Sequence, residues 1–251
     1  MKKKRNLKKN PFVSIITVVK NNQKYLEETI NSVLNQSYKN FEYIIIDGKS
    51  SDDSLKIIKK YDKNIDFWIS ENDKGIYDAF NKGLDLARGK FIVFVNSDDL
   101  LTSNAIQILK DYDIKNPNID FLFGTVKKHW GTLHGYKPWK IHFSWGFYSS
   151  HSTGFFIKKK AAKTIGKYNL KYSYSADYDY FYRMIVRHKF KGIGTKKNEL
   201  FGIFRPGGFS SKIKFIDHFF ETTKIRLDNK QNKFLVLFIF ILKFLKNLRK
   251  I

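Results

Sequence analysis

The stretch Phe91-Ile-Val-Phe-Val-Asn-Ser-Asp-Asp99 is the most informative part of this chain of 251 residues. Its first five residues are all β-branched or aromatic, which is typical of a strand buried in a parallel sheet. The next four are polar and end in two adjacent carboxylates. Neighbouring carboxylates repel each other unless a cation or hydrogen-bond donors satisfy them. This arrangement predicts a buried strand with an acidic site at its end.

The same alternation extends from this strand toward the N-terminus. The predicted strands are 13–19, 42–47 and 66–70, and the predicted helices are 25–36, 52–61 and 75–88. This β-α-β-α-β-α-β order predicts an α/β fold, with right-handed crossovers and a doubly wound, mostly parallel sheet flanked by helices. In such sheets, ligands bind outside the carboxyl ends of the strands.

The residues that follow the predicted strands are all polar. They are Lys20-Asn21-Asn22, Asp47-Gly48-Lys49, Ser70-Glu-Asn-Asp-Lys74 and Asn96-Ser-Asp-Asp99. Hard divalent cations such as Mg²⁺ or Mn²⁺ prefer oxygen ligands, often one or two carboxylates together with substrate phosphates. Asp98 and Asp99 therefore suit a metal site. Alternatively, one of them caps a helix that begins near Leu100.

Two weaker signals lie in the earlier loops. Asp47 could accept a hydrogen bond from a base or a ribose, and Gly48 allows close backbone approach. Lys74 precedes a predicted helix start, where a cation and free amides could bind phosphate. Alternatively, the first segment is an ordinary turn and the second belongs to a solvated helix face.

The pattern is less regular after residue 120. We predict a strand at 121–126, helices at 158–165 and 176–188, and a strand at 196–204. The intervening residues 127–151 indicate a long loop, and long loops in compact domains are often functional. Its aromatic side chains either stack on a ligand or fill a core: Trp130, Tyr136, Trp139, Trp145 and His151.

The composition is strongly basic. Lys and Arg number 47 against 23 Asp and Glu, which gives a formal net charge of +24. Such a surface attracts nucleic acid, anionic lipid or phosphate-bearing substrates. The absence of cysteine excludes disulfides, thiolate metal sites and a cysteine nucleophile. The basic N-terminus is not followed by a secretory apolar region, so we expect a cytoplasmic protein.

The tail differs from the rest of the chain. Residues 234–242 are nine consecutive apolar residues, and Lys243, Lys246, Arg249 and Lys250 follow. A membrane span needs about 20 apolar residues. The pattern therefore predicts an amphipathic helix that lies on an anionic membrane surface, at the inner face of the cell membrane. The alternative is a helix packed on the domain or on a second subunit.

Taken together, these segments resemble the family 2 glycosyltransferases of bacterial polysaccharide and glycan biosynthesis, which are inverting enzymes with the GT-A fold. The resemblance lies in Pro11–Asn21, 26–48, 73–83 and Gly89–Asp99, and covers about the first 105 residues. Fainter matches follow at Ser175-Ala-Asp-Tyr-Asp-Tyr-Phe-Tyr-Arg183 and at Arg205–Ser211. One departure is Thr17, which stands where many members have proline.

The resemblance implies a site for a nucleotide-diphosphate sugar, with a uridine nucleotide expected. The implied donor-binding residues are Thr17, Val19, Asp47, Gly48, Lys74, Asn96, Asp98 and Asp99. Within this set, Asp47 would hold the base and Asp98 would face the ribose or the sugar. Asp99 would ligate Mn²⁺ or Mg²⁺ bound to the diphosphate.

The resemblance also implies a hexosyl or N-acetylhexosaminyl transfer onto a glycan or lipid-linked acceptor. Asp177 would be the general base that deprotonates the acceptor hydroxyl, a role worth about 10²–10⁴-fold in rate. Asp179 is the competing candidate, but two residues apart on a helix the carboxylates cannot point the same way. Asp179 could instead cap the helix or pair with Arg183. Acceptor contacts are expected from His151, Trp145 and Asp179.

This interpretation divides the chain into a catalytic domain, 1–214, and a helical tail, 215–251. Residues 1–105 would bind the donor and residues 106–214 the acceptor. Three alternatives remain. A basic nucleic-acid-binding module is disfavoured because the lysines are dispersed and no known motif is present, so no specific nucleic acid is expected. A sugar-phosphate nucleotidyltransferase is disfavoured because Lys20–Gln23 contains no glycine. A family member without catalysis is disfavoured by Asp98, Asp99 and Asp177.

Overall fold

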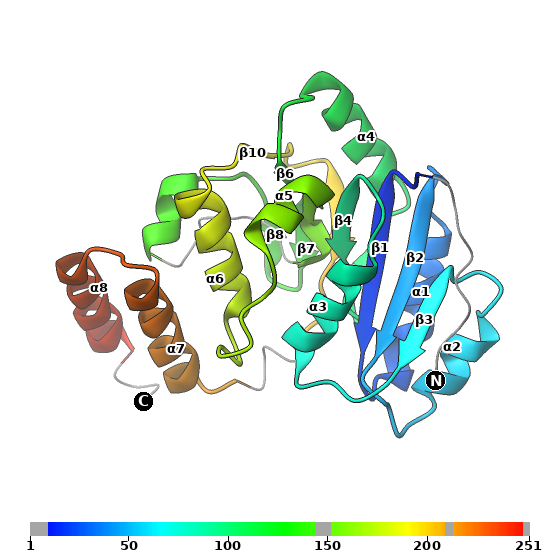
Figure 1. Ribbon diagram of the computed structural model, residues 1–251, viewed down its shortest axis with the longest axis horizontal. Coiled ribbons are helices and arrows are strands. Elements are labelled where there is room, and N and C mark those ends of the chain that lie inside the picture. The colour runs from blue at the N-terminus through cyan, green and yellow to red at the C-terminus, as the bar shows by residue number, and fades with distance from the viewer. Residues whose placement is uncertain (1–9, 144–151, 209–212, 248–251) are drawn as a thin grey trace.

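The computed structural model describes residues 10–143, 152–208 and 213–247 (Figure 1). A seven-stranded sheet with the order β10-β6-β9-β4-β1-β2-β3 forms its centre. Its strands are β1 (Val13–Val19), β2 (Phe41–Asp47), β3 (Phe67–Ser70), β4 (Phe91–Phe94), β6 (Phe121–Phe123), β9 (Phe155–Lys158) and β10 (Gly192–Gly194). Only β9 runs antiparallel to its neighbours, β4 and β6. The expected mostly parallel α/β sheet is confirmed.

Helices cover both faces of this sheet. They are α1 (Gln23–Leu34), α2 (Ser54–Lys60), α3 (Ile76–Leu86), α4 (Ala105–Lys115), α5 (Lys159–Ile165) and α6 (Ala176–Tyr182). In Figure 1, α1 and α3 lie on opposite faces of the sheet. Because successive residues of β1 point to opposite faces, Ile16 packs on the α3 side and Ile15 on the α1 side. Burial on both faces explains why the parallel strands are continuous apolar runs.

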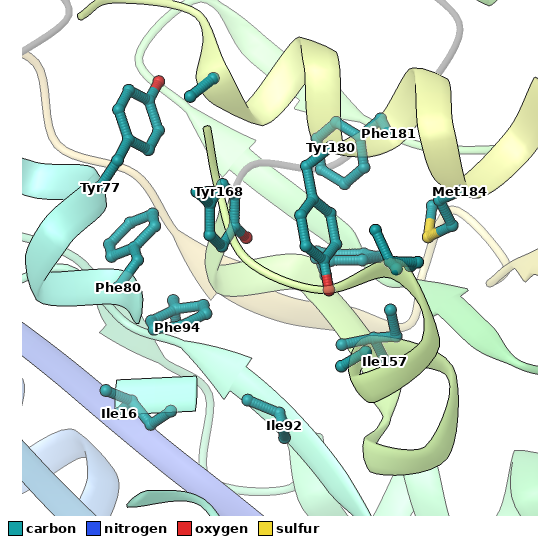
Figure 2. Packing of buried hydrophobic residues seen from close by; sticks show 14 of the residues in the cluster. Ile16, Tyr77, Phe80, Ile92, Phe94, Ile157, Tyr168, Tyr180, Phe181 and Met184 are labelled. Carbon is teal, nitrogen blue, oxygen red and sulfur yellow. The ribbon is translucent and has the colours of Figure 1, made fainter. Parts of the chain in front are cut away.

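An aromatic cluster joins α3 to α6 across the centre of the molecule (Figure 2). Phe80 stacks on Phe94 with ring centroids 4.2 Å apart, and Tyr168 stacks on Tyr180 at 4.4 Å. Tyr77 lies 5.7 Å from Tyr168 and links the two pairs. Aromatic pairs of this kind bury large apolar areas in defined geometry, so they fix α6 relative to the parallel strands.

A second, smaller sheet was not predicted as such. Its order is β5-β11-β7-β8, formed by β5 (Leu100–Leu101), β11 (Leu200–Ile203), β7 (Thr125–Lys128) and β8 (Gly131–Leu133). The predicted strand 121–126 is therefore two strands, β6 and β7, that enter different sheets. The predicted strand 196–204 shortens to β11. The predicted helix start near Leu100 is wrong, because Leu100 pairs with Ile203 of β11.

Part of the predicted long loop has regular structure. Beyond β7 and β8, it forms a short 3₁₀ helix at Pro138–Phe143, and another 3₁₀ turn lies at Ser152–Gly154. The predicted helix 176–188 is α-helical only to Tyr182 and continues as a π-helix over Arg183–Arg187. The predicted acceptor residues Trp145 and His151 lie outside the described residues.

The C-terminal segment forms a helical hairpin of α7 (Phe215–Asp228) and α8 (Lys233–Lys246). Arg226 of α7 is fully buried and donates from Nε to the Tyr178 hydroxyl of α6, at 3.2 Å. The hairpin is therefore anchored to α6 by a buried polar contact. Within the described ranges, no helix has both the length and the apolar character needed to cross a bilayer.

A buried carboxylate links β1 to β2 and pairs with Arg88, which precedes β4 and has a side chain 27% exposed. The Glu42 carboxylate is fully buried and accepts from the Ser14 hydroxyl at 2.6 Å and from the Arg88 guanidinium at 2.9 Å. We expect Glu42→Ala to lower the free energy of unfolding by about 3 kcal/mol, because it leaves Arg88 without its partner. Urea unfolding would measure this loss.

The matched control is Glu27→Ala, which removes a more exposed carboxylate that pairs with Lys60. It should change the free energy of unfolding far less. An equal loss in the two variants would contradict the structural role assigned to Glu42.

Candidate functional site

A cavity of about 640 Å³ opens where β1 and β4 end. Its wall combines the residues after these strands with α3, α6 and the segment around Gly208. The residues relevant to its chemistry are Val19, Asn22, Tyr25, Asp73, Tyr77, Asn96, Asp98, Ser152, Tyr168, Tyr174, Asp177 and Gly208. Four predicted site residues therefore meet in one cavity: Val19, Asn96, Asp98 and Asp177.

The acidic loop after β4 presents oxygen atoms to this cavity. Asn96 donates from Nδ2 to the Ser152 hydroxyl at 3.0 Å, while its buried Oδ1 has no hydrogen-bond partner among the described residues. Asp98 lines the cavity and lies against Gly208, where an added Cβ would come within 2.5 Å of Asp98 Oδ2. Glycine at this position allows the loop to approach the carboxylate closely.

Asp99 has a different environment from its neighbour. It is fully buried, and its carboxylate accepts from the Thr153 hydroxyl at 3.0 Å and from the Arg205 backbone N–H at 3.4 Å. Asp99 therefore lies behind the cavity wall, whereas Asp98 forms part of it.

The oxygen atoms of this loop fit a divalent cation in part. The unpartnered Asn96 Oδ1 and the Asp98 carboxylate are ligand types that Mg²⁺ and Mn²⁺ prefer. The part of the chain that the structure describes contains no group of three or more His, Asp or Glu side chains able to hold a metal ion. A cation here would need further ligands, such as the phosphates of a bound nucleotide.

The predicted nucleoside residues divide into two groups. Val19 lines the cavity, whereas Thr17 is fully buried beneath it and shares a 3.0 Å hydrogen bond with the Tyr43 hydroxyl. Asp47 is also fully buried, and its carboxylate accepts from the Ser50 and Ser70 hydroxyls at 2.5 Å each. These hydrogen bonds connect the end of β2 to the loop that follows it and to the end of β3.

Gly48 and Lys74 lie near the cavity but do not line it. A Cβ on Gly48 would come within 2.7 Å of Asp73 Oδ2, so the two loops approach each other closely there. Lys74 is exposed, and its backbone N–H donates to the Asp78 carboxylate at 3.1 Å.

Asp73 is a cavity residue that the sequence did not single out. Its carboxylate pairs with Lys82 at 2.5 Å, and burial raises the pKa of Asp73 above its usual value. Tyr25 was missed as well, and the Arg205 guanidinium lies 4.8 Å from the centre of its ring. Asp73 belongs to a charged, polar segment, so nothing in the local pattern separates it from a solvated helix start.

Asp177 lies in the first turn of α6 and faces the cavity. Its Oδ1 accepts from the Tyr77 hydroxyl at 3.2 Å and from the Tyr178 backbone N–H at 2.9 Å. Burial, reinforced by the negative charge of Asp177, raises the pKa of Tyr77 well above its usual value. Tyr77 therefore stays protonated, and its one hydroxyl proton is shared between Asp177 Oδ1 and the Tyr174 carbonyl oxygen, which is 3.1 Å away.

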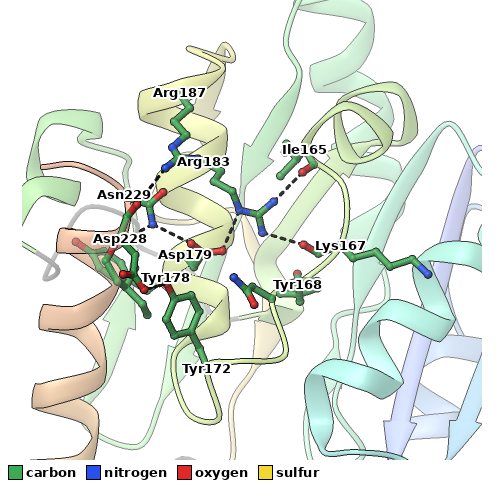
Figure 3. Close-up of polar contacts among 12 residues, drawn as sticks. Ile165, Lys167, Tyr168, Tyr172, Tyr178, Asp179, Arg183, Arg187, Asp228 and Asn229 are labelled. Atoms are coloured by element: carbon green, nitrogen blue, oxygen red, sulfur yellow. Dashed lines mark hydrogen bonds and ion pairs between the residues drawn. The ribbon is translucent and has the colours of Figure 1, made fainter.

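Asp179 is 3% exposed and lies in a separate polar network (Figure 3). It accepts from Arg183 Nε at 2.9 Å and from Asn229 Nδ2 at 2.8 Å. Arg183 in turn donates to the backbone carbonyl groups of Ile165 and Lys167. The alternative in which Asp179 pairs with Arg183 is confirmed, and Asp179 does not line the cavity that contains Asp177.

The aromatic residues of the middle region have separate positions. Trp130 and Trp139 are 61% and 60% exposed, so they do not fill a core. Tyr136 packs against Phe121 and Phe123 with ring centroids 5.4 and 5.3 Å apart. These three aromatic side chains do not line the cavity.

Known glycosyltransferases are similar to this chain in sequence. The uncharacterized glycosyltransferase MJ1057 of Methanocaldococcus jannaschii is 33% identical over 190 residues, which are 70% of this chain and 65% of that protein. WfgD of Escherichia coli, a UDP-Glc:alpha-D-GlcNAc-diphosphoundecaprenol beta-1,3-glucosyltransferase, is 36% identical over 117 residues, 46% of each chain. The chain thus spans less than two thirds of either relative.

Solved structures share the fold. Staphylococcus aureus TarS 1-349 in complex with UDP superimposes with a TM-score of 0.67 at 17% identity, over 86% of this chain and 64% of that one. The mannosyltransferase PcManGT of Pyrobaculum calidifontis, in complex with GDP-Man and Mn²⁺, gives 0.64 at 15% identity, over 90% and 66%. The sequence profile of glycosyl transferase family 2 matches residues 14–190, well over half of the sequence. This chain therefore belongs to glycosyl transferase family 2.

Proposed function

We propose that this protein is an inverting glycosyltransferase that moves a sugar from a nucleotide-diphosphate sugar onto a hydroxyl of a glycan or lipid-linked acceptor. The observation that supports this best is the meeting of Asp98 and Asp177 in one cavity. They come from elements 79 residues apart in the sequence, one at the end of β4 and the other on α6. This arrangement provides one carboxylate for the donor side and one for the acceptor.

The proposed donor is a UDP-sugar. TarS was solved with UDP, and the name of WfgD states UDP-Glc, whereas PcManGT was solved with GDP-Man. Val19 and Asp73 would border the nucleoside, with Gly48 behind Asp73. A role of Thr17, Asp47 and Lys74 in donor binding stays a prediction. Asp47 could contact a base only after releasing Ser50 or Ser70, which now occupy its carboxylate.

A divalent cation, Mn²⁺ or Mg²⁺, is part of the proposal. Asp98 and Asn96 would hold it at the cavity wall, and Asp99 is the adjacent carboxylate that the family resemblance favours. When bound, the cation supplies positive charge that stabilises the departing diphosphate. PcManGT, which was solved with Mn²⁺, supports this choice.

Asp177 is the proposed general base. Its carboxylate takes the proton of the acceptor hydroxyl while that oxygen attacks the anomeric carbon. The bond from this carbon to the diphosphate oxygen breaks in the same displacement, which inverts the stereochemistry. Tyr77 and the Tyr178 backbone N–H hold Asp177 Oδ1, so the carboxylate is oriented before the acceptor binds.

We also propose a division of the chain by role. Residues 1–105 would bind the donor, residues 106–214 the acceptor, and residues 215–251 would form an appended hairpin. The cavity is consistent with the first two assignments, since Asp98 lies in one half and Asp177 in the other.

The donor proposal predicts nucleotide-dependent stabilisation. A ligand that binds only the folded protein adds about 2.7 kcal/mol of stability at a hundred times its Kd. We expect UDP with Mn²⁺ to raise the Tm by several degrees, and GDP, dTDP and CDP to raise it less. Thermal unfolding with each nucleotide, with and without Mn²⁺, measures this.

Two variants test which carboxylate accounts for the Mn²⁺-dependent part of the rise in Tm. Asp98→Ala should remove the Mn²⁺-dependent part of the shift, judged against the Tm of the same variant without nucleotide. Asp99→Ala should remove it too, but with a lower Tm of the free protein, because its carboxylate is buried against Thr153. Asp53→Ala, on the surface beside Lys56, is the control. If no nucleotide shifts the wild-type Tm, the assignment of the cavity as the donor site is wrong.

The general-base proposal separates Asp177 from Asp179. Asp177→Asn should lower transfer by about 10²–10⁴-fold while UDP binding and Tm are retained. Asp179→Asn should lower the free energy of unfolding by about 2 kcal/mol, because it weakens buried hydrogen bonds to Arg183 and Asn229. UDP release with diphosphate-lipid-linked sugar acceptors measures transfer, and urea unfolding measures stability. Full transfer by Asp177→Asn would contradict the assignment, and so would a folded Asp179→Asn that loses transfer as completely as Asp177→Asn.

A further inference from the structure

Helix α8 presents an apolar stripe that no other described element covers. Its members recur at positions i, i+3, i+4, i+7, i+8 and i+11, which places them on one side of a helix. Each is between 47% and 84% exposed: Phe234, Leu237, Phe238, Ile241, Leu242 and Leu245. Scattered single apolar side chains on a surface are ordinary, whereas a contiguous patch of this size indicates an interaction site.

The stripe is not the side by which α8 packs on the protein. Val236 and Ile239, on the opposite side of the helix, are 3% and 1% exposed. Phe240, at the edge, stacks on Phe219 of α7 with ring centroids 4.7 Å apart. Phe220 of α7 is also exposed and lies 6.1 Å from Phe240, so it extends the apolar surface onto α7.

Positive charge borders the stripe. At 100° per residue, the exposed Lys233 and Lys246 lie on its two opposite edges, near the two ends of the helix. From Asn229 to Ile251 the sequence has six Lys and Arg and no Asp or Glu, but Lys243 lies on the opposite side of α8 from the stripe, where burial lowers its pKa to about 7. Lysines at such edges can extend toward lipid headgroups while their methylene stems stay against apolar surface.

We propose that α8 lies in the plane of an anionic bilayer surface, with the stripe inserted among the acyl chains and its lysines at the headgroups. The charge favours this occupant over a second copy of the chain. Pairing two stripes would bring like-charged helices together on molecules of net charge +24, whereas anionic lipid neutralises that charge. The apolar face, basic edges and length match helices that bind membranes in this way.

The hairpin is coupled to the wall of the cavity. Glu221 of α7 accepts from the backbone N–H of Tyr174 at 2.8 Å, and Tyr174 lines the cavity that contains Asp177. A bilayer bound along α8 would therefore hold this cavity near the headgroups. The inference that the protein binds a lipid surface is drawn from α8 alone. It does not depend on the proposed transferase chemistry.

Vesicle co-sedimentation tests the proposal. We expect the wild-type protein to bind vesicles of phosphatidylglycerol and phosphatidylcholine, and to bind pure phosphatidylcholine much more weakly. Leu237→Ser, Phe238→Ser and Ile241→Ser combined should lower the partition coefficient by about a hundredfold or more. Ile114→Ser, which replaces a 67% exposed residue of α4, is the matched control and should bind like wild type.

A charge variant tests the choice of anionic lipid. Lys233→Gln with Lys246→Gln should weaken binding to the anionic vesicles by about thirtyfold, since each lysine near such a surface is worth about 1 kcal/mol. Because all the replaced side chains are exposed, the Tm and the UDP-dependent shift should stay unchanged. If UDP still raises the Tm of these variants, a loss of vesicle binding cannot be attributed to a damaged donor site.

Two results would overturn the proposal. One is absence of wild-type binding to the anionic vesicles at low salt. The other is light scattering that shows a dimer which the triple serine variant dissociates while vesicle binding is unaffected. That second result would assign the stripe to self-association.

Discussion

Parallel pairing of β1 with both β2 and β4 is the constraint on which the candidate site depends. The register places Val19 beside Asp47, Asp47 beside Ser70, and Ile16 beside Phe94. The parallel strands β1, β2, β3 and β4 therefore end at one edge of the sheet. Because their faces are covered by helices, polar side chains concentrate where the strands end. The acidic loop after β4 thus meets the loop after β1.

Both acidic motifs of the chain divide their two carboxylates between the cavity and the interior. Asp98 lines the cavity while Asp99 is buried against Thr153, and Asp177 lines it while Asp179 is buried against Arg183. In each pair the buried carboxylate fixes the backbone beside the accessible one. A buried, hydrogen-bonded charge is strongly position-specific, because displacing it leaves partners unsatisfied. Each acidic motif thus contributes one carboxylate to the cavity and one to a buried hydrogen-bond network.

The parallel half of the fold could be predicted from the sequence, whereas much of the second half could not. β1 was predicted to the residue, because its seven buried residues form one apolar run. β9 was missed because only Phe155, Phe156 and Ile157 precede lysines, too short a run to distinguish a strand. The residues of β5 and β11 pair with each other across about 100 positions, so their partners are set by tertiary contacts.

The site could be predicted at the level of motifs more than of individual side chains. Asp98 and Asp177 each follow from a local motif, and both line the cavity. That both line one cavity depends on the packing of Phe80, Tyr168 and Tyr180 between α3 and α6, which no local pattern encodes. Asp73 lines the cavity for a different reason: its loop approaches Gly48 so closely that an added Cβ there would come within 2.7 Å of Asp73 Oδ2.

The hairpin and the cavity share one structural unit, α6. Arg226 and Asn229 of the hairpin donate to Tyr178 and Asp179, while Asp177 on the same helix faces the cavity. Buried hydrogen bonds of this kind resist sliding, because each shift leaves a donor or acceptor unpaired in a low-dielectric interior. These contacts connect α7 and the residue that follows it to the first turn of α6. The appended hairpin and the cavity are thus linked through the helix that carries the proposed base.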